Sequence, residues 1–250
     1  MNILAIGNSF SQDATAYLEP ICKAAGREDR IVNLYIGGCP LKLHWENICK
    51  NAPRYEEQLE AQHTGRMLSI AEALEEGPWD VVTLQQASHD SGLEKTYYPY
   101  LSSIASFVRW KSPQAKVWIH QTWAYEIDSN HGSFPVYDRD QNKMYAALTA
   151  AYAKASRAIG APIIPCGETV QYLRKTPTFD YANGGLSLCR DGFHLSIPYG
   201  RYVAAAVWFE MLTGGDITQN TFVPQGADPA IIELLRGEVH RFVAARKENA

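Results

Sequence analysis

The sequence lacks the features that mark several protein classes. It has five cysteines in 250 residues and no C-x-x-C pair, which argues against a disulfide framework or a zinc ribbon. No apolar run approaches the ~18 residues of a membrane-spanning helix, and no secretory signal is recognisable, so we expect a cytoplasmic protein outside the membrane. Lys and Arg form no long basic block and the formal net charge is −4, which disfavours nucleic acid as a partner.

What the sequence does contain is an alternation of short apolar runs with longer amphipathic stretches. No linker rich in Pro, Gly or Ser divides the chain, so we expect a single domain over residues 1–250. The apolar runs predict five strands: Asn2–Gly7, Ile31–Ile36, Trp79–Leu84, Ala115–His120 and Ala161–Pro165. Their near-continuous apolar character predicts a doubly wound (flavodoxin-like) three-layer α/β/α sandwich with a five-stranded, mostly parallel sheet.

The amphipathic stretches predict the helices that cover this sheet. Their ranges are Asp13–Ala25, Pro53–Glu76 with a break near Gly65, Tyr97–Trp110, Asp138–Ile159, Pro198–Leu212 and Ala227–Arg246. The longer loops lie at the carboxyl ends of strands, over Gly37–Ala52, Gln85–Thr96, Gln121–Tyr137 and Thr176–Ile197. Ligands bind at that edge of an open α/β sheet, so we expect the functional site there.

The first candidate for chemistry is the segment Gly7-Asn8-Ser9-Phe10-Ser11, which follows the first predicted strand. Free backbone N–H groups at the start of a helix favour negative charge. Three interpretations stay open at this point: a nucleophilic Ser9 beside an oxyanion site, a loop that holds the phosphate of a nucleotide or flavin, and a plain helix cap by Ser9 or Ser11. The segment is not G-x-S-x-G, so it does not match the nucleophile elbow of the α/β-hydrolases.

The second candidate is Asp191-Gly192-Phe193-His194, on the loop after the last predicted strand. At this spacing the carboxylate of Asp191 can reach Nδ1 of His194, which leaves Nε2 free to accept a proton. A parallel sheet brings this loop to the same edge as Ser9. The three side chains then fit the roles of nucleophile, base and orienting carboxylate.

In the order and spacing of these blocks the chain resembles the SGNH (GDSL-like) hydrolases, in particular a bacterial branch of unknown function. The matching blocks are Gly7-Asn8-Ser9-Phe10-Ser11, the glycines Gly37-Gly38 after the second strand, and the D-x-x-H block Asp191–His194. The resemblance spans nearly the whole chain. It implies a catalytic triad of Ser9, Asp191 and His194, with the N–H groups of Ser9 and Gly38 as oxyanion donors.

The third block of that family, G-x-N-D, is absent after Leu84. Gln85-Gln86-Ala87-Ser88 stands in its place. A glutamine amide carries the same NH₂ donor as asparagine on a longer arm. We therefore expect Gln86 to be the third oxyanion donor, with Gln85 as the alternative.

Further side chains on the same predicted edge are candidates for substrate binding. These are His44, Trp45, Gln121 and Trp123, for which ordinary loop packing is the alternative. His89-Asp90 has no further His or Asp at ligand spacing, so we expect no metal. No organic cofactor is expected either.

These observations predict a serine esterase or deacylase that hydrolyses a small acyl ester through an acyl-enzyme. The resemblance implies an acetyl group on a carbohydrate as the substrate. The partner of the protein is then a small-molecule or carbohydrate ester. One alternative is an acyl hydrolase of the lipase or thioesterase type. Another is a non-catalytic module on the same fold that binds carbohydrate or nucleotide. The oligomeric state stays open.

Overall fold

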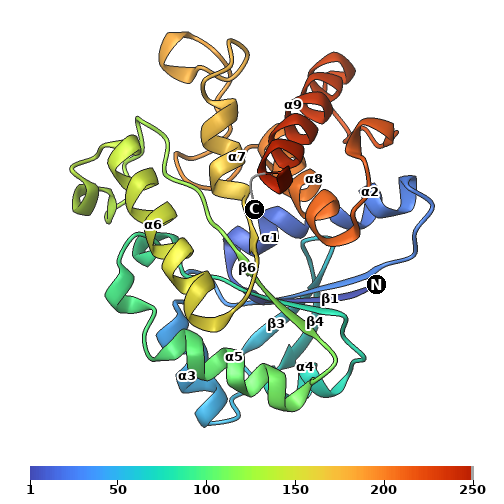
Figure 1. The fold of residues 1–250 in the computed structure, drawn as a ribbon, viewed down its shortest axis with the longest axis vertical. Coiled ribbons are helices and arrows are strands. Elements are labelled where there is room, and N and C mark those ends of the chain that lie inside the picture. The colour runs from blue at the N-terminus through green and yellow to red at the C-terminus, as the bar shows by residue number, and fades with distance from the viewer. Residues whose placement is uncertain (249–250) are drawn as a thin grey trace.

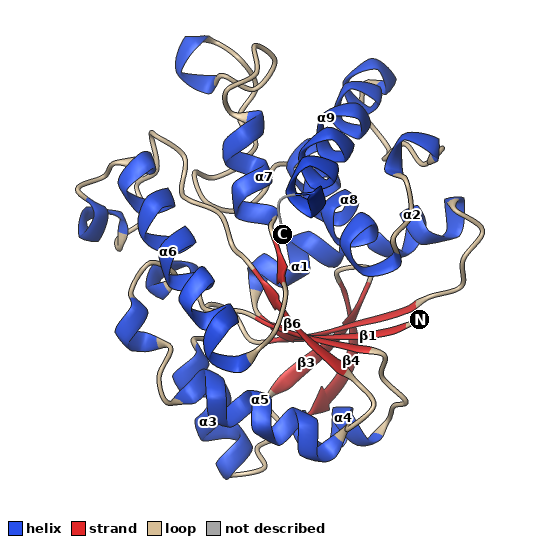
Figure 2. Ribbon diagram, in the orientation of Figure 1, coloured by secondary structure: helices blue, strands red, loops and turns tan. Residues whose placement is uncertain are grey.

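The computed structural model describes residues 1–248, and its centre is a seven-stranded sheet (Figures 1 and 2). The strands lie in the order β4-β3-β2-β1-β5-β6-β7. Their bounds are β1 Asn2–Gly7, β2 Arg30–Tyr35, β3 Tyr55–Leu59, β4 Gln62–Leu68, β5 Val81–Leu84, β6 Lys116–His120 and β7 Ile163–Ile164.

Five of these strands are parallel neighbours and correspond to the five predicted apolar runs. Their order, β2-β1-β5-β6-β7, is the 2-1-3-4-5 order of flavodoxin-like sheets when only these five are counted. The predicted α/β class with a mostly parallel sheet is confirmed. The predicted count of five strands is wrong, because a hairpin adds two strands beside β2.

The hairpin replaces most of the helix predicted over Pro53–Glu76, and that prediction is wrong. β3 and β4 pair antiparallel through a turn at Glu60 and Ala61, which have φ of 49° and 61°, and only Ile70–Glu75 forms a helix, α4. The many Glu, Gln, Leu and Met residues favour a helix locally. Pairing of β3 with β2 outweighs that preference, because it satisfies the backbone of β2 and extends the sheet.

Helices cover both faces of the sheet (Figure 1). Below it in Figure 1 lie α3 Leu41–Cys49, α4 and α5 Tyr100–Lys111, and above it lie α1 Ser9–Thr15, α2 Leu18–Ala24, α7 Cys166–Leu173, α8 Tyr199–Thr213 and α9 Pro229–Glu248. α6, over Gln141–Ile159, packs against β7, α5 and α7. No helix among residues 1–248 is long and apolar enough to cross a membrane.

Three helical features differ from the sequence prediction. The first helix begins at Ser9 rather than Asp13, and it is interrupted between α1 and α2. The predicted loop Gly37–Ala52 contains α3, and α7 was not predicted. The early start of α1 matters most, because it places Ser9 in the first turn of a helix.

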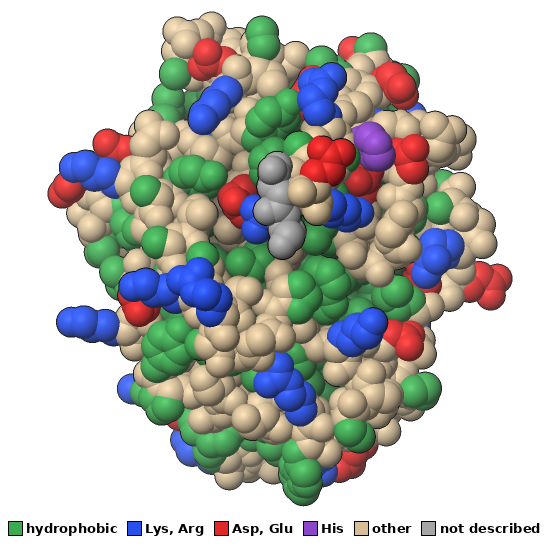
Figure 3. Space-filling view, in the orientation of Figure 1, with side chains coloured by type: hydrophobic (Ala, Val, Ile, Leu, Met, Phe, Trp, Pro, Cys, Tyr) green, Lys and Arg blue, Asp and Glu red, His purple; other side chains and the backbone are tan. Residues whose placement is uncertain are grey.

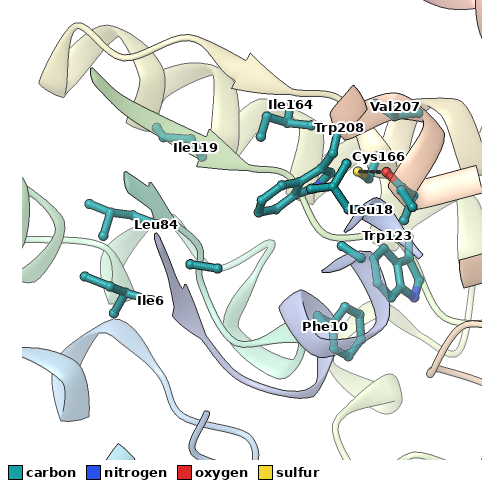
Figure 4. Packing of buried hydrophobic residues seen from close by; sticks show 14 of the residues in the cluster. Ile6, Phe10, Leu18, Leu84, Ile119, Trp123, Ile164, Cys166, Val207 and Trp208 are labelled. Atoms are coloured by element: carbon teal, nitrogen blue, oxygen red, sulfur yellow. Dashed lines mark hydrogen bonds between the residues drawn. The ribbon is translucent and has the colours of Figure 1, made fainter. Parts of the chain in front are cut away.

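The buried core continues up to the edge where α1 begins (Figure 4). Trp208 of α8 packs over the sheet near Ile119 and Ile164, which come from β6 and β7. Phe10 stacks on Trp123 with ring centroids 4.3 Å apart, and both rings are buried. The residue beside Ser9 is therefore anchored in the core. On the face shown in Figure 3, basic and acidic side chains are interspersed rather than gathered by sign.

Candidate active site

The structure brings Ser9, His194 and Asp191 into one hydrogen-bonded line. Nε2 of His194 lies 2.9 Å from Oγ of Ser9, and Nδ1 of His194 lies 2.7 Å from Oδ2 of Asp191. Because the carboxylate can only accept, Nδ1 carries the proton and Nε2 presents its lone pair to the serine hydroxyl. This is the arrangement that a general base needs to take the proton of a serine nucleophile.

The carboxylate of Asp191 is held ionised. Burial by itself would raise its pKa, but the hydrogen bonds from the His194 ring and from the backbone N–H groups of His194 and Phe193 outweigh burial and lower the pKa below its usual value. The charge that orients the imidazole is thus present across the neutral range.

The loop that carries Asp191 and His194 is fixed from the β6 side. The N–H of Glu126 donates to the carbonyl of Gly192 at 2.7 Å, and Nε1 of Trp123 donates to the carbonyl of Phe193 at 2.7 Å. Gly192 has φ of +83°, and a Cβ there would lie 2.9 Å from Cα of Ser129. Only glycine fits this turn without displacing its neighbour.

A buried carboxylate ties the same loop to the helix that carries Ser9. Asp13, with no exposed surface, accepts from the N–H of Leu195 at 2.8 Å, from Arg190 at 3.0 Å and from Nε of Arg201 at 2.8 Å. Arg190 also donates to the carbonyl of Leu195. Asp13 lies one helical turn after Ser9, so these contacts of Asp13, hereafter the Asp13 clamp, connect α1 directly to the segment 190–195.

Two backbone N–H groups are free to receive negative charge beside Ser9. Within residues 1–248, neither the N–H of Ser9 nor that of Gly38 has a hydrogen-bond acceptor in the protein. Gly38 has φ of +62°, in a turn that the N–H of Cys39 closes onto the carbonyl of Ile36 at 3.2 Å. Both residues line one cavity of about 410 Å³.

Gln86 does not point into that cavity. Its side chain is fully buried, with Nε2 donating to Thr96 at 2.9 and 3.1 Å and Oε1 accepting from the N–H of Leu41 at 2.9 Å. Gln85 is also buried, and its Nε2 donates to Asn8 at 2.7 Å. Because both amides are already engaged, neither of the two expected residues is placed to donate to an oxyanion.

The loop after β5 reaches the cavity through Ser88 and His89 instead. The cavity wall also contains the triad's serine and histidine, and its residues are Ser9, Phe10, Gln12, Tyr35, Gly37, Gly38, Ser88, His89, His131, Arg190, Phe193 and His194. Tyr35, His131 and Arg190 line the cavity but are not among the site residues that the sequence predicts. A signal for Arg190 was present in its position directly before Asp191.

The four expected substrate-binding residues do not line the cavity. His44 and Trp123 are buried, His44 beside the hydroxyl of Tyr55 at 2.9 Å and Trp123 under Phe10. Gln121 is buried and binds Glu168, with Nε2 to Oε2 at 3.1 Å. Trp45 is partly buried and packs against the core from α3. Their loops do follow strand ends, but these side chains turn inward.

The thiols near the site are not thiolates. Burial raises the pKa of Cys39 and of Cys189 to about 12 in each case, so both stay protonated at neutral pH. A thiolate is the nucleophilic form of cysteine. The hydroxyl of Ser9, in contrast, has an imidazole nitrogen within hydrogen-bonding distance, at 2.9 Å.

A group of side chains with metal-ligand chemistry lies on another part of the chain. Among residues 1–248, ligand atoms of Glu210, Asp216 and His240 lie within 4.8 Å of one another. Oε1 of Glu210 already accepts from the N–H of Ile217 and lies 2.8 Å from Nδ1 of His240, and Oδ1 of Asp216 accepts from Thr218. These contacts explain the group as a polar link between α8, α9 and the segment between them.

The chain was compared with known families and structures. The profile of a family described as a domain of unknown function, DUF4886, matches residues 2–240. Among proteins of curated function none is significantly similar. A crystal structure of a DUF4886 family protein from Bacteroides uniformis is 37% identical, with 98% of this chain and 95% of that chain covered and a TM-score of 0.90.

More distant structures share the fold alone. A protein from Slackia heliotrinireducens, provisionally described as an SGNH hydrolase, is 22% identical over 85% of this chain and 98% of that chain, with a TM-score of 0.57. A catalytic mutant of an acetylxylan esterase from Geobacillus stearothermophilus is 12% identical over 84% and 92%, with a TM-score of 0.53.

Proposed function

Because the chain belongs to the DUF4886 family and has the fold of SGNH-type hydrolases, we propose that it is a serine esterase that removes a small acyl group, acetyl in particular, from a carbohydrate. The observation that carries the proposal is the hydrogen-bonded line Ser9–His194–Asp191 beside two free backbone N–H groups. A binding module needs neither the line nor the N–H pair.

The proposed reaction begins when Oγ of Ser9 attacks the ester carbonyl carbon and Nε2 of His194 takes the hydroxyl proton. The carbonyl π electrons move to the oxygen, which becomes an oxyanion bound by the N–H groups of Ser9 and Gly38. Collapse of this intermediate breaks the ester C–O bond, and His194 returns its proton to the leaving alcohol. Water, deprotonated by the same imidazole, then releases the acid and regenerates Ser9.

A general base and two backbone oxyanion donors are sufficient for a large rate enhancement. A positioned general base contributes about 10²–10⁴-fold in rate. Each well-placed oxyanion donor contributes about 10²–10³-fold. The third donor expected from the family pattern is therefore not required for substantial turnover.

The cavity supports a polar carrier rather than a long acyl chain. Among the described residues 1–248, its wall holds one permanent cation, Arg190, together with His89, His131 and the hydroxyl of Tyr35, and no carboxylate. Burial, with some help from the neighbouring imidazoles, lowers the pKa of His131, which leaves a neutral ring able to hydrogen-bond sugar hydroxyls. The shared fold of an acetylxylan esterase is consistent with this substrate class.

The test is hydrolysis of p-nitrophenyl acetate and of a panel of acetylated sugars by the wild-type protein and by Ser9→Ala. We expect wild-type turnover that falls by at least ~10³-fold in folded Ser9→Ala. Ser103→Ala, which removes a half-buried hydroxyl of α5 that donates to the carbonyl of Pro99 at 3.1 Å, is the matched control and should retain full activity. Turnover that survives in Ser9→Ala would move the nucleophile elsewhere, and sugar binding without any hydrolysis would support a non-catalytic module.

Chain-length selectivity tests the finer part of the proposal. The ratio of kcat/KM for p-nitrophenyl acetate to that for p-nitrophenyl octanoate should exceed one, because polar side chains outnumber the two phenylalanines, Phe10 and Phe193, on the cavity wall. A preference for octanoate would favour a lipase or thioesterase instead.

A further inference from the structure

The two proposed oxyanion donors come from different segments of the chain. A contact between the segments is therefore needed to fix the position of one N–H group relative to the other. Ser9 begins α1, whereas Gly38 lies in the turn after β2. The side chain of Asn8 joins the two segments. Its Oδ1 accepts from the N–H of Phe10 at 3.0 Å in the first turn of α1, and its Nδ2 donates to the carbonyl of Cys39 at 3.1 Å beside Gly38.

This link works in only one orientation of the Asn8 amide. If the amide were rotated by 180°, its NH₂ would face the N–H of Phe10 and its oxygen would face the carbonyl of Cys39. Both contacts would then be repulsive. The position of the oxyanion donors thus depends on what fixes the Asn8 amide.

Gln85 and His120 hold the Asn8 amide in this orientation. Nε2 of Gln85 donates to Oδ1 of Asn8 at 2.7 Å, and Oε1 of Gln85 accepts from Nδ1 of His120 at 2.7 Å. All three side chains are at least 98% buried. Burial lowers the pKa of His120 to about 3, so its ring is neutral. Because Oε1 of Gln85 can only accept, the proton of this neutral ring lies on Nδ1. The backbone N–H of Phe10 can only donate, so Oδ1 of Asn8 is the acceptor, and the donor direction runs from His120 through Gln85 to Asn8.

We infer that Gln85, backed by His120, is a positioning residue of the oxyanion site, which acts through Asn8 to hold the N–H groups of Ser9 and Gly38 on one point. The inference rests on the proposed esterase function. Gln85 is 2% exposed and does not line the cavity, so it does not touch the substrate. It replaces the direct donor role that the family pattern led us to expect at this block.

Gly7 fits the same interpretation. A Cβ on Gly7 would lie 2.2 Å from Oγ of Ser11 and 3.2 Å from Cδ of Gln85. Ser11 in turn accepts from the N–H of Asn8 at 3.0 Å. Glycine at this position therefore lets Gln85 and Ser11 approach Asn8 from two sides.

The main experiment compares Gln85→Met with Asn220→Leu. Asn220 is a matched control, because it is also a buried amide with two hydrogen bonds, from the N–H of Phe222 at 3.0 Å and to the carbonyl of Ile21 at 2.8 Å, away from the cavity. Both variants should lose thermal stability. Only Gln85→Met should lower kcat, by about 10–10²-fold with KM within twofold. A displaced N–H donor stabilises the transition state less, whereas it changes the binding of the substrate little.

Labelling of Ser9 by a small fluorophosphonate gives a second readout. That reaction also places negative charge on an oxygen beside the two N–H groups, so it should slow in Gln85→Met and not in Asn220→Leu. A kcat and a labelling rate within twofold of wild type in Gln85→Met would overturn the inference. So would an equal loss of kcat in Asn220→Leu, since the effect would then be one of general stability.

Gln85→Glu keeps the inference testable if Gln85→Met does not fold. A protonated Glu can still donate to Asn8 and accept from His120, whereas an ionised Glu can only accept. Burial raises the pKa of a carboxyl group. The kcat of Gln85→Glu relative to wild type should therefore fall about 10-fold as pH rises from 5 to 8, and a constant ratio near one would contradict the role.

The two proposals can fail separately. If the wild-type protein neither hydrolyses esters nor reacts with the fluorophosphonate at Ser9, the esterase function fails. If the wild type does both and Gln85 variants match it, only the positioning role fails.

Discussion

The substitution Asp13→Asn should cost the protein both stability and turnover, and the structure sets the size of each loss. Removing one partner of a buried ion pair costs about 3–5 kcal/mol, because the remaining charge is left uncompensated. Asp13 has no exposed surface, but its partners Arg190 and Arg201 keep 31% and 16% of their side-chain surface exposed, so water can compensate part of their charge. We therefore expect the lower limit, about 3 kcal/mol, and a fall in Tm of about 6–12 °C.

Turnover should fall in Asp13→Asn because the contacts of Asp13 hold the segment 190–195 against α1. Arg190 and Leu195 bracket Asp191 and His194, so a loosened segment 190–195 moves the imidazole relative to Ser9. A displacement of about 1 Å can cost ~10²-fold, and we expect kcat to fall at least 10-fold with KM little changed.

Urea unfolding and steady-state kinetics measure the two losses. The matched control is Glu57→Gln, which removes a buried carboxylate that binds Arg66 at 2.9 Å in the β3–β4 hairpin; neither of these two residues lines the cavity. This control should lose stability and keep its kcat. The reasoning is refuted if Asp13→Asn loses less than about 1 kcal/mol, or if it is destabilised like the control but turns over at the wild-type rate.

Three further predictions test other parts of the structure. Gly38→Ala should lower kcat about 10-fold, because φ of +62° strains a residue with a Cβ and the turn would relax away from the oxyanion; steady-state kinetics checks this. Stability should be complete above pH 6.5 and fall below it, because burial lowers the pKa of His44 and of His120 to about 3 and only the unfolded chain takes up these protons. Each ring lowers the free energy of unfolding by up to about 1.4 kcal/mol per pH unit below pH 6.5. Urea midpoints that stay constant between pH 7 and pH 5 would contradict this prediction. Dialysis against EDTA should leave esterase activity unchanged, and a loss restored by Zn²⁺ would contradict a metal-free triad.

The sequence was sufficient to predict the meeting of Ser9 with Asp191 and His194. Apolar strands are easily recognised, and in a parallel sheet their carboxyl ends converge. Segments that follow the first and last strands are therefore expected at one edge of the sheet. The contact itself also depends on Glu126 and Trp123, which follow β6 and bind the carbonyls of Gly192 and Phe193.

The third oxyanion donor could not be predicted, because its assignment depends on a single residue step. Successive side chains at a strand end point to opposite sides, so Gln85 and Gln86 have different surroundings although their chemistry is identical. Gln86 turns to Thr96 and Gln85 to Asn8. Nothing in the local sequence distinguishes these partners, since both are remote in the chain or lie on an irregular loop.

The prediction of a helix in place of the β3–β4 hairpin was wrong for a different reason. Charged residues such as Glu57 and Arg66 are typical of the polar face of a helix. In the structure they form an ion pair between β3 and β4. At the edge of a sheet, a polar strand is stabilised by pairing with its neighbour rather than by its own apolar pattern. Such strands carry little hydrophobic periodicity from which to predict them.

The separation of the two reacting residues along the chain has a consequence for the timing of synthesis. Ser9 and His194 are 185 residues apart, and the segments that carry them are joined through Asp13. At about 5–20 residues per second, a ribosome would need roughly 10–40 s after making the serine to reach the histidine. For that interval the nascent chain would hold a serine without a base. Activity would then appear as a late event of synthesis, and its onset in a translation reaction would report the docking of residues 190–195 on α1.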